Sequence, residues 1–149
     1  MQRTPATEPF GFVLTDAARL LRTSVDRALE AAGLDITPGD ARILAVLDQL
    51  GPMRQSALAS RLMIEPMTVI GHIDRLEKLG LVERLPDPGD RRAKLIRPTE
   101  AAVAEIRRIR GVVTGARQQA LRGFTPAEQE TLHALLLRLR DGLAEETTR

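Results

Sequence analysis

The segment that most constrains the fold lies in the middle of the chain, where helical spacing of apolar residues gives way to strand-like runs. A short helical pattern, a longer one, a strand-like run, a polar loop and a second strand-like run follow one another at residues 56–62, 65–79, 81–85, 86–92 and 93–97. The loop is rich in proline, glycine and aspartate, which is typical of a hairpin. This order predicts a helix-turn-helix followed by a β-hairpin wing.

Helical patterns also flank this segment on both sides. Apolar residues recur at helical spacing over residues 11–32, and Thr37 is suited to cap a second helix. After the hairpin, Thr99 is suited to cap a long helix, and Thr125 and Glu128 have the spacing of a capping box at the start of a final helix. We therefore expect a mainly α fold with one small β-hairpin.

The outer helices carry more apolar surface than one small chain can bury. Leucines recur on one side of the last helix, at Leu132, Leu135, Leu136, Leu139 and Leu143. The first helix and the last two are long for a chain of 149 residues, so their apolar stripes have little core to face. The simplest account is a homodimer that packs these ends together; a monomeric helical bundle is the alternative.

Composition excludes several classes of protein. Because the chain has no cysteine, disulfides, thiolate metal sites and thiol redox sensing are excluded. It has no Trp or Tyr and only three Phe, which gives little support for single-strand binding by base stacking. No stretch approaches the ~20 apolar residues of a membrane span, and the N-terminal residues lack a signal-peptide pattern. We expect a cytoplasmic protein with no membrane partner, and any nucleic acid that it binds should be double-stranded.

The hairpin is positively charged although the chain as a whole is nearly neutral. The formal net charge is +2, but residues 84–97 hold five basic and two acidic residues. Such a patch attracts phosphate, and the arginines at its tip suit a narrow, electronegative minor groove. Asp90 can hold Arg92 in place through a charge-assisted hydrogen bond. An exposed ion pair of little consequence is the alternative.

The second helix of the central pair has an inner and an outer face. Val69, Ile73 and Leu76 recur at helical spacing and should pack against the first helix. The outer face can then enter a major groove with its N-terminal residues against base edges. The candidate DNA-binding residues are Gln55, Ser56, Pro66, Met67, Thr68, Ile70, Gly71 and Arg75 of the helix pair, and Asp90, Arg91, Arg92 and Lys94 of the hairpin. An ordinary helical hairpin is the alternative.

These residues resemble the core of the MarR family of transcription regulators. The resemblance rests on Leu58-Ala59-x-x-Leu62, on Thr68-Val69, on the runs 74–84 and 87–100, and most specifically on Asp90-x-Arg92 with Leu95 and Thr99 after it. It implies one domain over residues 1–149. Within that domain, residues 36–98 would form the winged helix-turn-helix lobe, and residues 11–35 and 99–149 would form the dimerisation helices.

The resemblance also implies a function. In the MarR family a homodimer binds a pseudo-palindromic operator and usually represses transcription, often until a small anionic or aromatic effector binds between the dimer helices and the lobes. By resemblance, Thr68, Ile70, Gly71 and Arg75 would read the major groove. Arg92 would enter the minor groove with Asp90 as its partner. The resemblance implies neither a cofactor nor catalysis.

Four positions depart from the pattern of the family, one of them Ala102, which stands where a glycine often follows Thr-Glu-Ala. Met63 stands in the turn where many relatives carry glycine, so we expect a turn conformation that does not require glycine. Gly71 replaces a position that is commonly polar or basic, which predicts the loss of one base contact. His72 stands where a leucine commonly packs, and the sequence does not assign it a role.

Other functions remain as alternatives. An enzyme is disfavoured because the two histidines lie on separate helices and neither a Ser-His-Asp set nor a glycine-rich phosphate loop is present. A metal-responsive regulator could use His72 and His133, although their spacing is not that of a ligand pair. A helical protein-interaction module without DNA binding would show no salt-dependent affinity for duplex DNA.

Overall fold

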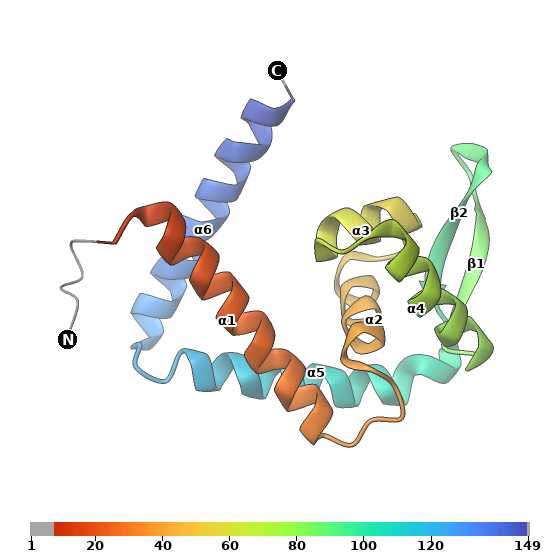
Figure 1. The fold of residues 1–149 in the computed structure, drawn as a ribbon, viewed down its shortest axis with the longest axis horizontal. Coiled ribbons are helices and arrows are strands. Elements are labelled where there is room, and N and C mark those ends of the chain that lie inside the picture. Colours follow the sequence, from red (N-terminus) through yellow and green to blue (C-terminus); the bar gives the residue numbers. More distant parts are fainter. Residues whose placement is uncertain (1–7, 149) are drawn as a thin grey trace. The chain divides into compact units, whose positions relative to one another are not determined.

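The computed structural model describes residues 8–148 of the chain. The elements are α1 (Phe10–Ala31), α2 (Pro38–Leu50), α3 (Gln55–Leu62), α4 (Pro66–Lys78), β1 (Val82–Asp87), β2 (Asp90–Pro98), the 3-10 turn η1 (Glu100–Ala102), α5 (Val103–Ala120) and α6 (Pro126–Thr147) (Figure 1). The chain divides after Ala116 into two compact units. The expected mainly α fold with a single hairpin is confirmed.

The core of the first unit lies where α2, α3, α4 and the hairpin meet. Its buried residues are Ile43, Leu44 and Leu47 of α2, Leu58, Ala59 and Leu62 of α3, Val69, Ile73 and Leu76 of α4, Val82 and Ile96 of the hairpin, and Ile106 and Ile109 of α5. The inner face predicted from helical spacing on α4 is therefore confirmed. Ala59 is small where α3 and α4 cross, which allows their backbones to approach closely.

Two helices begin at the capping residues that the sequence predicts, Thr37 and Thr125, and each of these residues forms a capping box. At α2 the Thr37 hydroxyl accepts a hydrogen bond from the Asp40 amide at 3.1 Å, and the Asp40 carboxylate accepts one from the Thr37 amide at 3.1 Å. At α6 the corresponding distances between Thr125 and Glu128 are 3.2 and 2.8 Å. Each box satisfies two amides that a helix N-terminus would otherwise leave unpaired.

The wing strands are longer than the sequence predicts. We expected a loop over residues 86–92, but β1 continues to Asp87 and β2 already begins at Asp90, which leaves two residues between them. The antiparallel register shifts between Pro86 and Asp87. Proline has no backbone amide to donate to the ladder, so a strand tolerates it at an irregularity such as this one, where the ladder is interrupted.

Two local expectations are wrong. The Thr99 hydroxyl does not cap a helix; it donates to the Gly80 carbonyl, and η1 precedes the start of α5 at Val103. Met63 has φ 53° and ψ 48°, the left-handed conformation that glycine favours. The turn between α3 and α4 thus keeps a glycine-type geometry despite its side chain.

The second unit consists of the end of α5, a short connection and α6. Gln129 joins the connection to α6, since its side-chain amide donates a hydrogen bond to the Phe124 carbonyl at 3.2 Å. No residue of α6 is buried. Among the helices of residues 8–148, none is both long enough and apolar enough to cross a membrane.

Candidate nucleic-acid interface

Helix α4 presents its N-terminal end to solvent. Its inner residues are fully buried, whereas Pro66, Met67 and Thr68 are exposed, Met67 by 76%. Of the other predicted contact residues on this helix, Ile70 and Gly71 are half-buried. The first turn of α4 therefore offers short polar and apolar side chains, the types that suit base edges and thymine methyls.

Arg84 of β1 braces α4 against the wing. Its guanidinium contacts the Asp74 carboxylate at 2.6 Å and the Glu77 carboxylate at 2.8 Å, and it donates to the Gln55 side-chain oxygen at 3.3 Å. The brace neutralises the two acidic residues of α4, which would otherwise repel a phosphate backbone. Gln55, a predicted DNA contact, is half-buried and takes part in this brace, whereas Ser56 next to it is exposed.

The tip of the wing is held by backbone hydrogen bonds to two aspartates. Asp90 accepts from the backbone amide of Arg92 at 2.9 Å, so it orders the turn and not the guanidinium. Asp87 accepts from the Gly89 amide at 2.9 Å and also pairs with Arg54 at 2.6 Å. The Gly89 amide first and the Arg54 guanidinium second lower the pKa of Asp87. The Asp87 carboxylate that shapes the tip thus stays charged and bonded.

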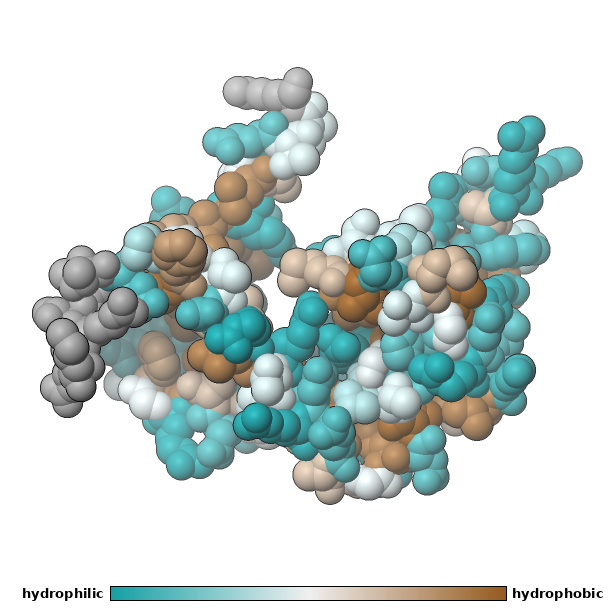
Figure 2. All heavy atoms as spheres, in the orientation of Figure 1, coloured by the Kyte–Doolittle hydropathy of each residue, from teal (hydrophilic) through white to brown (hydrophobic). Residues whose placement is uncertain are grey.

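The cations at the tip point to solvent. Arg91, Arg92 and Lys94 are exposed, and none forms an ion pair with any of residues 8–148. The space-filling view shows the wing tip as a hydrophilic projection (Figure 2). Unpaired cations on a projecting hairpin keep their full attraction for phosphate.

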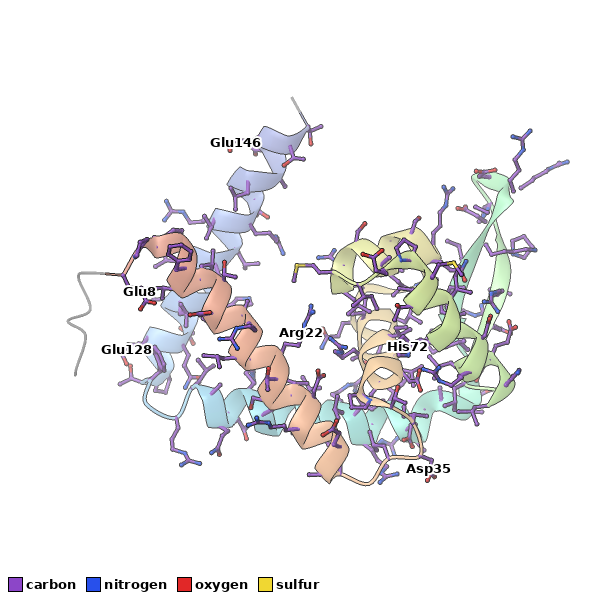
Figure 3. All side chains as sticks on the ribbon, viewed as in Figure 1. Glu8, Arg22, Asp35, His72, Glu128 and Glu146 are labelled. Carbon is purple, nitrogen blue, oxygen red and sulfur yellow. The ribbon has the colours of Figure 1, made fainter. Side chains whose placement is uncertain are left out.

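Arg75 of α4, unlike the cations at the tip of the wing, is paired with a carboxylate. Asp40 of α2, which is 2% exposed, accepts a hydrogen bond from Arg75 Nη2 at 3.0 Å. His72 of α4 also contacts this carboxylate, with 2.6 Å between its Nδ1 and Asp40 Oδ1, and in Figure 3 His72 lies on the α2 side of α4. Burial raises the pKa of Asp40, but hydrogen bonds from His72, Arg75 and Thr37 outweigh it, and the pKa lies below its ordinary value.

Several residues of this site could not be found from the sequence. Three of its contacts join residues that lie far apart in the sequence. The separation is 33 positions between Arg54 and Asp87, 10 between Arg84 and Asp74, and 35 between Asp40 and Arg75. Arg22 of α1 likewise donates to the Leu62 carbonyl at the end of α3, at 2.7 Å. No local spacing signals such pairs, because they arise only when separate elements pack together.

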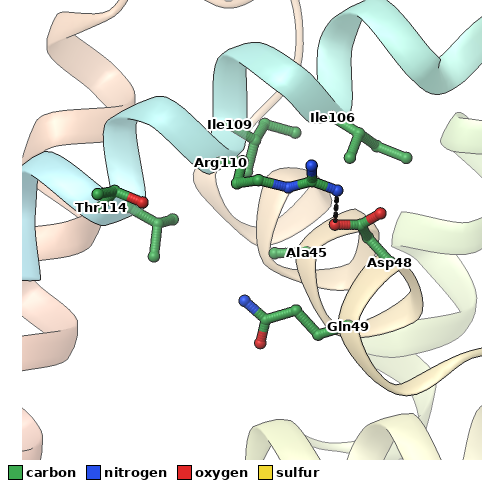
Figure 4. Close-up of a pocket in the computed structure, with 8 residues that line it drawn as sticks. Ala45, Asp48, Gln49, Ile106, Ile109, Arg110 and Thr114 are labelled. Carbon is green, nitrogen blue, oxygen red and sulfur yellow. Dashed lines mark hydrogen bonds and ion pairs between the residues drawn. The ribbon is translucent and has the colours of Figure 1, made fainter.

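A small hollow lies in the first unit between α2 and α5 (Figure 4). It has a volume of about 40 Å³ and is lined by Ala45, Asp48, Gln49, Ile106, Ile109, Arg110, Val113 and Thr114. Arg110 and Asp48 form an ion pair of 2.7 Å at its edge. Four of the eight lining residues are apolar and four are polar or charged, and small-molecule sites likewise combine apolar walls with polar groups that fix orientation.

The histidines do not form a metal centre within the described chain. No group of three or more histidine, aspartate or glutamate side chains that could hold a metal ion occurs among residues 8–148. His72 Nδ1 is occupied by its contact with Asp40. His133 is exposed on α6.

Comparison with known proteins places these features in context. A sequence model of the MarR family matches residues 36–94. A probable transcriptional regulator from Pseudomonas aeruginosa is 31% identical; the match covers 89% of this chain and 97% of that chain, with a TM-score of 0.66. The apo form of MarR from E. coli is 25% identical over 89% of this chain and 96% of that chain, with a TM-score of 0.71.

Related structures include a complex with DNA and a protein regulated by a small molecule. A cysteine-to-serine variant of E. coli MarR, solved with operator DNA, is 24% identical, with 93% of this chain and 99% of that chain covered and a TM-score of 0.67. Bordetella bronchiseptica BpsR, whose DNA binding is regulated by 6-hydroxynicotinic acid, is 24% identical, with 94% and 99% covered and a TM-score of 0.70.

Proposed function

The chain belongs to the MarR family of winged helix-turn-helix transcriptional regulators, and from this premise we propose that it is a repressor that binds a pseudo-palindromic operator as a homodimer. A small-molecule effector would release it from the operator. Proteins of this family are transcriptional regulators and not enzymes. The proposal places the protein in the cytoplasm.

One observation carries the DNA-binding part of the proposal. The exposed first turn of α4 and the unpaired cations of the wing belong to the same compact unit, joined by the Arg84 brace. A helix presented in this way can place its N-terminal residues against base edges in the major groove. The wing can then reach the neighbouring minor groove with Arg92, which suits its negative potential.

The unburied apolar residues of α1 and α6 support the homodimer. On α1 the exposed apolar residues are Phe10, Phe12, Val13, Leu20 and Leu21, and on α6 they are Leu132, Leu135, Leu136, Leu137 and Leu143. So much exposed apolar surface is unusual for a monomer and is typical of a subunit interface. A second copy of the chain would bury these faces and set the two α4 helices about 34–36 Å apart, one turn of DNA.

The hollow between α2 and α5 is our candidate effector site. Its volume of about 40 Å³ is well below the ~300 Å³ of a typical ligand pocket, so an effector must open it. An anionic effector would compete with Asp48 for Arg110, whose side chain is 63% exposed. Because α2 belongs to the DNA-binding lobe, displacing it would change the position of the lobes and weaken binding to DNA.

Selection from a random pool of duplexes tests the proposal directly. We expect the purified protein to recover a two-fold symmetric sequence, with an affinity that falls steeply as salt rises. Size measurement on the bound complex should give two chains per operator. An affinity that does not depend on salt or sequence would refute the proposal and favour a protein-interaction module.

The effector site is tested by repeating the binding assay with small aromatic and aliphatic acids. An acid that releases wild-type protein should have a weaker effect on Arg110→Gln, because that variant lacks the charge but keeps similar bulk. Arg108→Gln is the matched control, since Arg108 lies on the same helix but does not line the hollow. Equal release of all three proteins would place the effector elsewhere.

A further inference from the structure

Four residues join the N-terminal end of α2 to α4, and we call them the α2–α4 clasp: Gly39, Asp40, His72 and Arg75. Asp40 is the only buried charged side chain in the core of residues 8–148. A buried carboxylate is costly unless donors compensate it. His72 and Arg75 supply those donors from one face of α4, since three residues separate them along the helix.

Gly39 makes room for the imidazole. A Cβ atom at this position would lie 2.3 Å from His72 Cε1 and 2.6 Å from His72 Nε2, distances that no side chain tolerates. At every other glycine of residues 8–148, an added Cβ atom would lie at least 3.5 Å from the nearest heavy atom beyond the neighbouring residues. The fit between Gly39 and His72 is therefore specific to the clasp.

The distances indicate how the donors are arranged. His72 Nδ1 lies 2.6 Å from Asp40 Oδ1 and 2.7 Å from Arg75 Nη2. Arginine is always a donor, so two arrangements have to be compared. If Nδ1 accepted from Arg75, its lone pair would face the Asp40 oxygen at 2.6 Å. If Nδ1 carries its proton, both Nδ1 and Nη2 donate to Oδ1, which satisfies the buried carboxylate and leaves these two donors side by side, 2.7 Å apart.

This arrangement holds Arg75 by one side of its guanidinium. Nη2 lies 3.0 Å from Oδ1 and Nε 3.5 Å from Oδ2, whereas Nη1 takes part in none of these contacts. The Arg75 side chain is 50% exposed. Arg75 thus has donors available to an acceptor outside the protein, and its direction is set from α2. A guanidinium held in one direction loses less conformational entropy when it binds.

We propose that Asp40 and His72 are positioning residues for DNA recognition, which aim Arg75 at a base or phosphate acceptor without touching DNA themselves. The inference rests on the proposed function, because it takes α4 to be the recognition helix. It adds residues of α2 to the determinants of operator preference. A free Arg75 would still attract phosphate, but it would sample many directions and discriminate poorly among sequences.

The test is a double-mutant cycle on Asp40 and Arg75, read as the ratio of the Kd for a scrambled duplex to the Kd for the selected operator. Asp40→Asn keeps an acceptor for the Thr37 amide but removes the charge. We expect it to lower this ratio on the order of tenfold and to strengthen binding to the scrambled duplex. In an Arg75→Ala background the same substitution should leave the ratio unchanged.

Asp35→Asn is the matched control, since it removes the same charge at an exposed position in the connection before α2. An unchanged ratio for Asp40→Asn would overturn the inference. So would an equal change in the Arg75→Ala background, because Asp40 would then act on the fold and not through Arg75. If wild-type protein has no operator preference at all, the proposed function fails and the inference fails with it.

A second pair of variants tests the clasp even if Asp40→Asn does not fold. Gly39→Ala should displace the imidazole, lower the melting temperature and reduce operator preference in the wild-type background. In a His72→Ala background, where no ring is present to displace, Gly39→Ala should have no effect on the melting temperature. Equal losses in both backgrounds would show that Gly39 and His72 are not coupled, which would also overturn the inference.

Discussion

The helices of the winged lobe and the long helix α6 use their apolar residues in opposite ways. Six of the 13 residues of α2 are buried, whereas none of the 22 residues of α6 is. Helix α1 resembles α6 in this respect, with Leu29 as its only buried residue. The lobe therefore has a core of its own, whereas α1 and α6 present the largely unburied faces on which the proposed homodimer depends. We expect substitutions in the two regions to fail in different ways.

The largest effect is expected from charges placed on the apolar face of α6. The double substitution Leu136→Asp and Leu139→Asp should give monomers and abolish operator binding, because each unpaired buried charge costs about 3–5 kcal/mol. Sedimentation or light scattering measures the oligomeric state. Ala134→Asp is the control, since Ala134 lies on the opposite side of the helix from Leu136. A double variant that stays dimeric would show that the interface lies elsewhere.

The second largest effect is expected from a substitution that leaves a cavity in the core of the winged lobe. Leu44 of α2 is fully buried, so Leu44→Ala should lower the free energy of unfolding by about 2–5 kcal/mol. Leu135→Ala on α6, where the side chain is 51% exposed, should instead weaken association between chains. Denaturant unfolding at several protein concentrations separates the two effects. Equal losses of stability that are independent of concentration would contradict the difference between the regions.

Removing a wing arginine should affect neither the core nor the dimer. Arg92→Ala should weaken operator binding on the order of tenfold and reduce the dependence of log K on log salt by about 1. Arg97→Ala is the matched control, since Arg97 lies on the same strand but is paired with Glu83. Fluorescence anisotropy at several salt concentrations gives both quantities. Wild-type affinity in Arg92→Ala would remove the wing from the interface.

The smallest expected effect is the contribution of Asp40 to stability as pH changes. Its pKa is lowered in the folded protein, so its stabilisation is complete well above pH 3.8. It is lost as pH falls through 3.8 toward the lower folded-state pKa, because the unfolded chain then binds the proton more readily. The difference in unfolding free energy between wild type and Asp40→Asn should shrink over this range. A constant difference would show that the charge of Asp40 does not contribute.

The candidate site combines features that the sequence predicts with others that it does not. Helical spacing and capping residues predict α4 and its buried face, and the basic, turn-rich segment predicts the wing. Sequence alone could not show that Gln55 is engaged by Arg84, that Arg75 is held by Asp40, or that His72 fits against Gly39. Each of these contacts joins residues brought together only by packing.

The sequence by itself determined the order of the elements, the cap at Thr37, the capping box at Thr125, and the face of α4 that is buried. These depend on residues within a few positions of one another, where backbone propensity and periodicity decide the outcome. Tertiary structure alone decided the carboxylate partners of Arg54, Arg75 and Arg84, the extent of the wing strands and the role of the Thr99 hydroxyl. Those depend on which groups meet across elements, and a buried polar group takes whichever partner packing brings within reach.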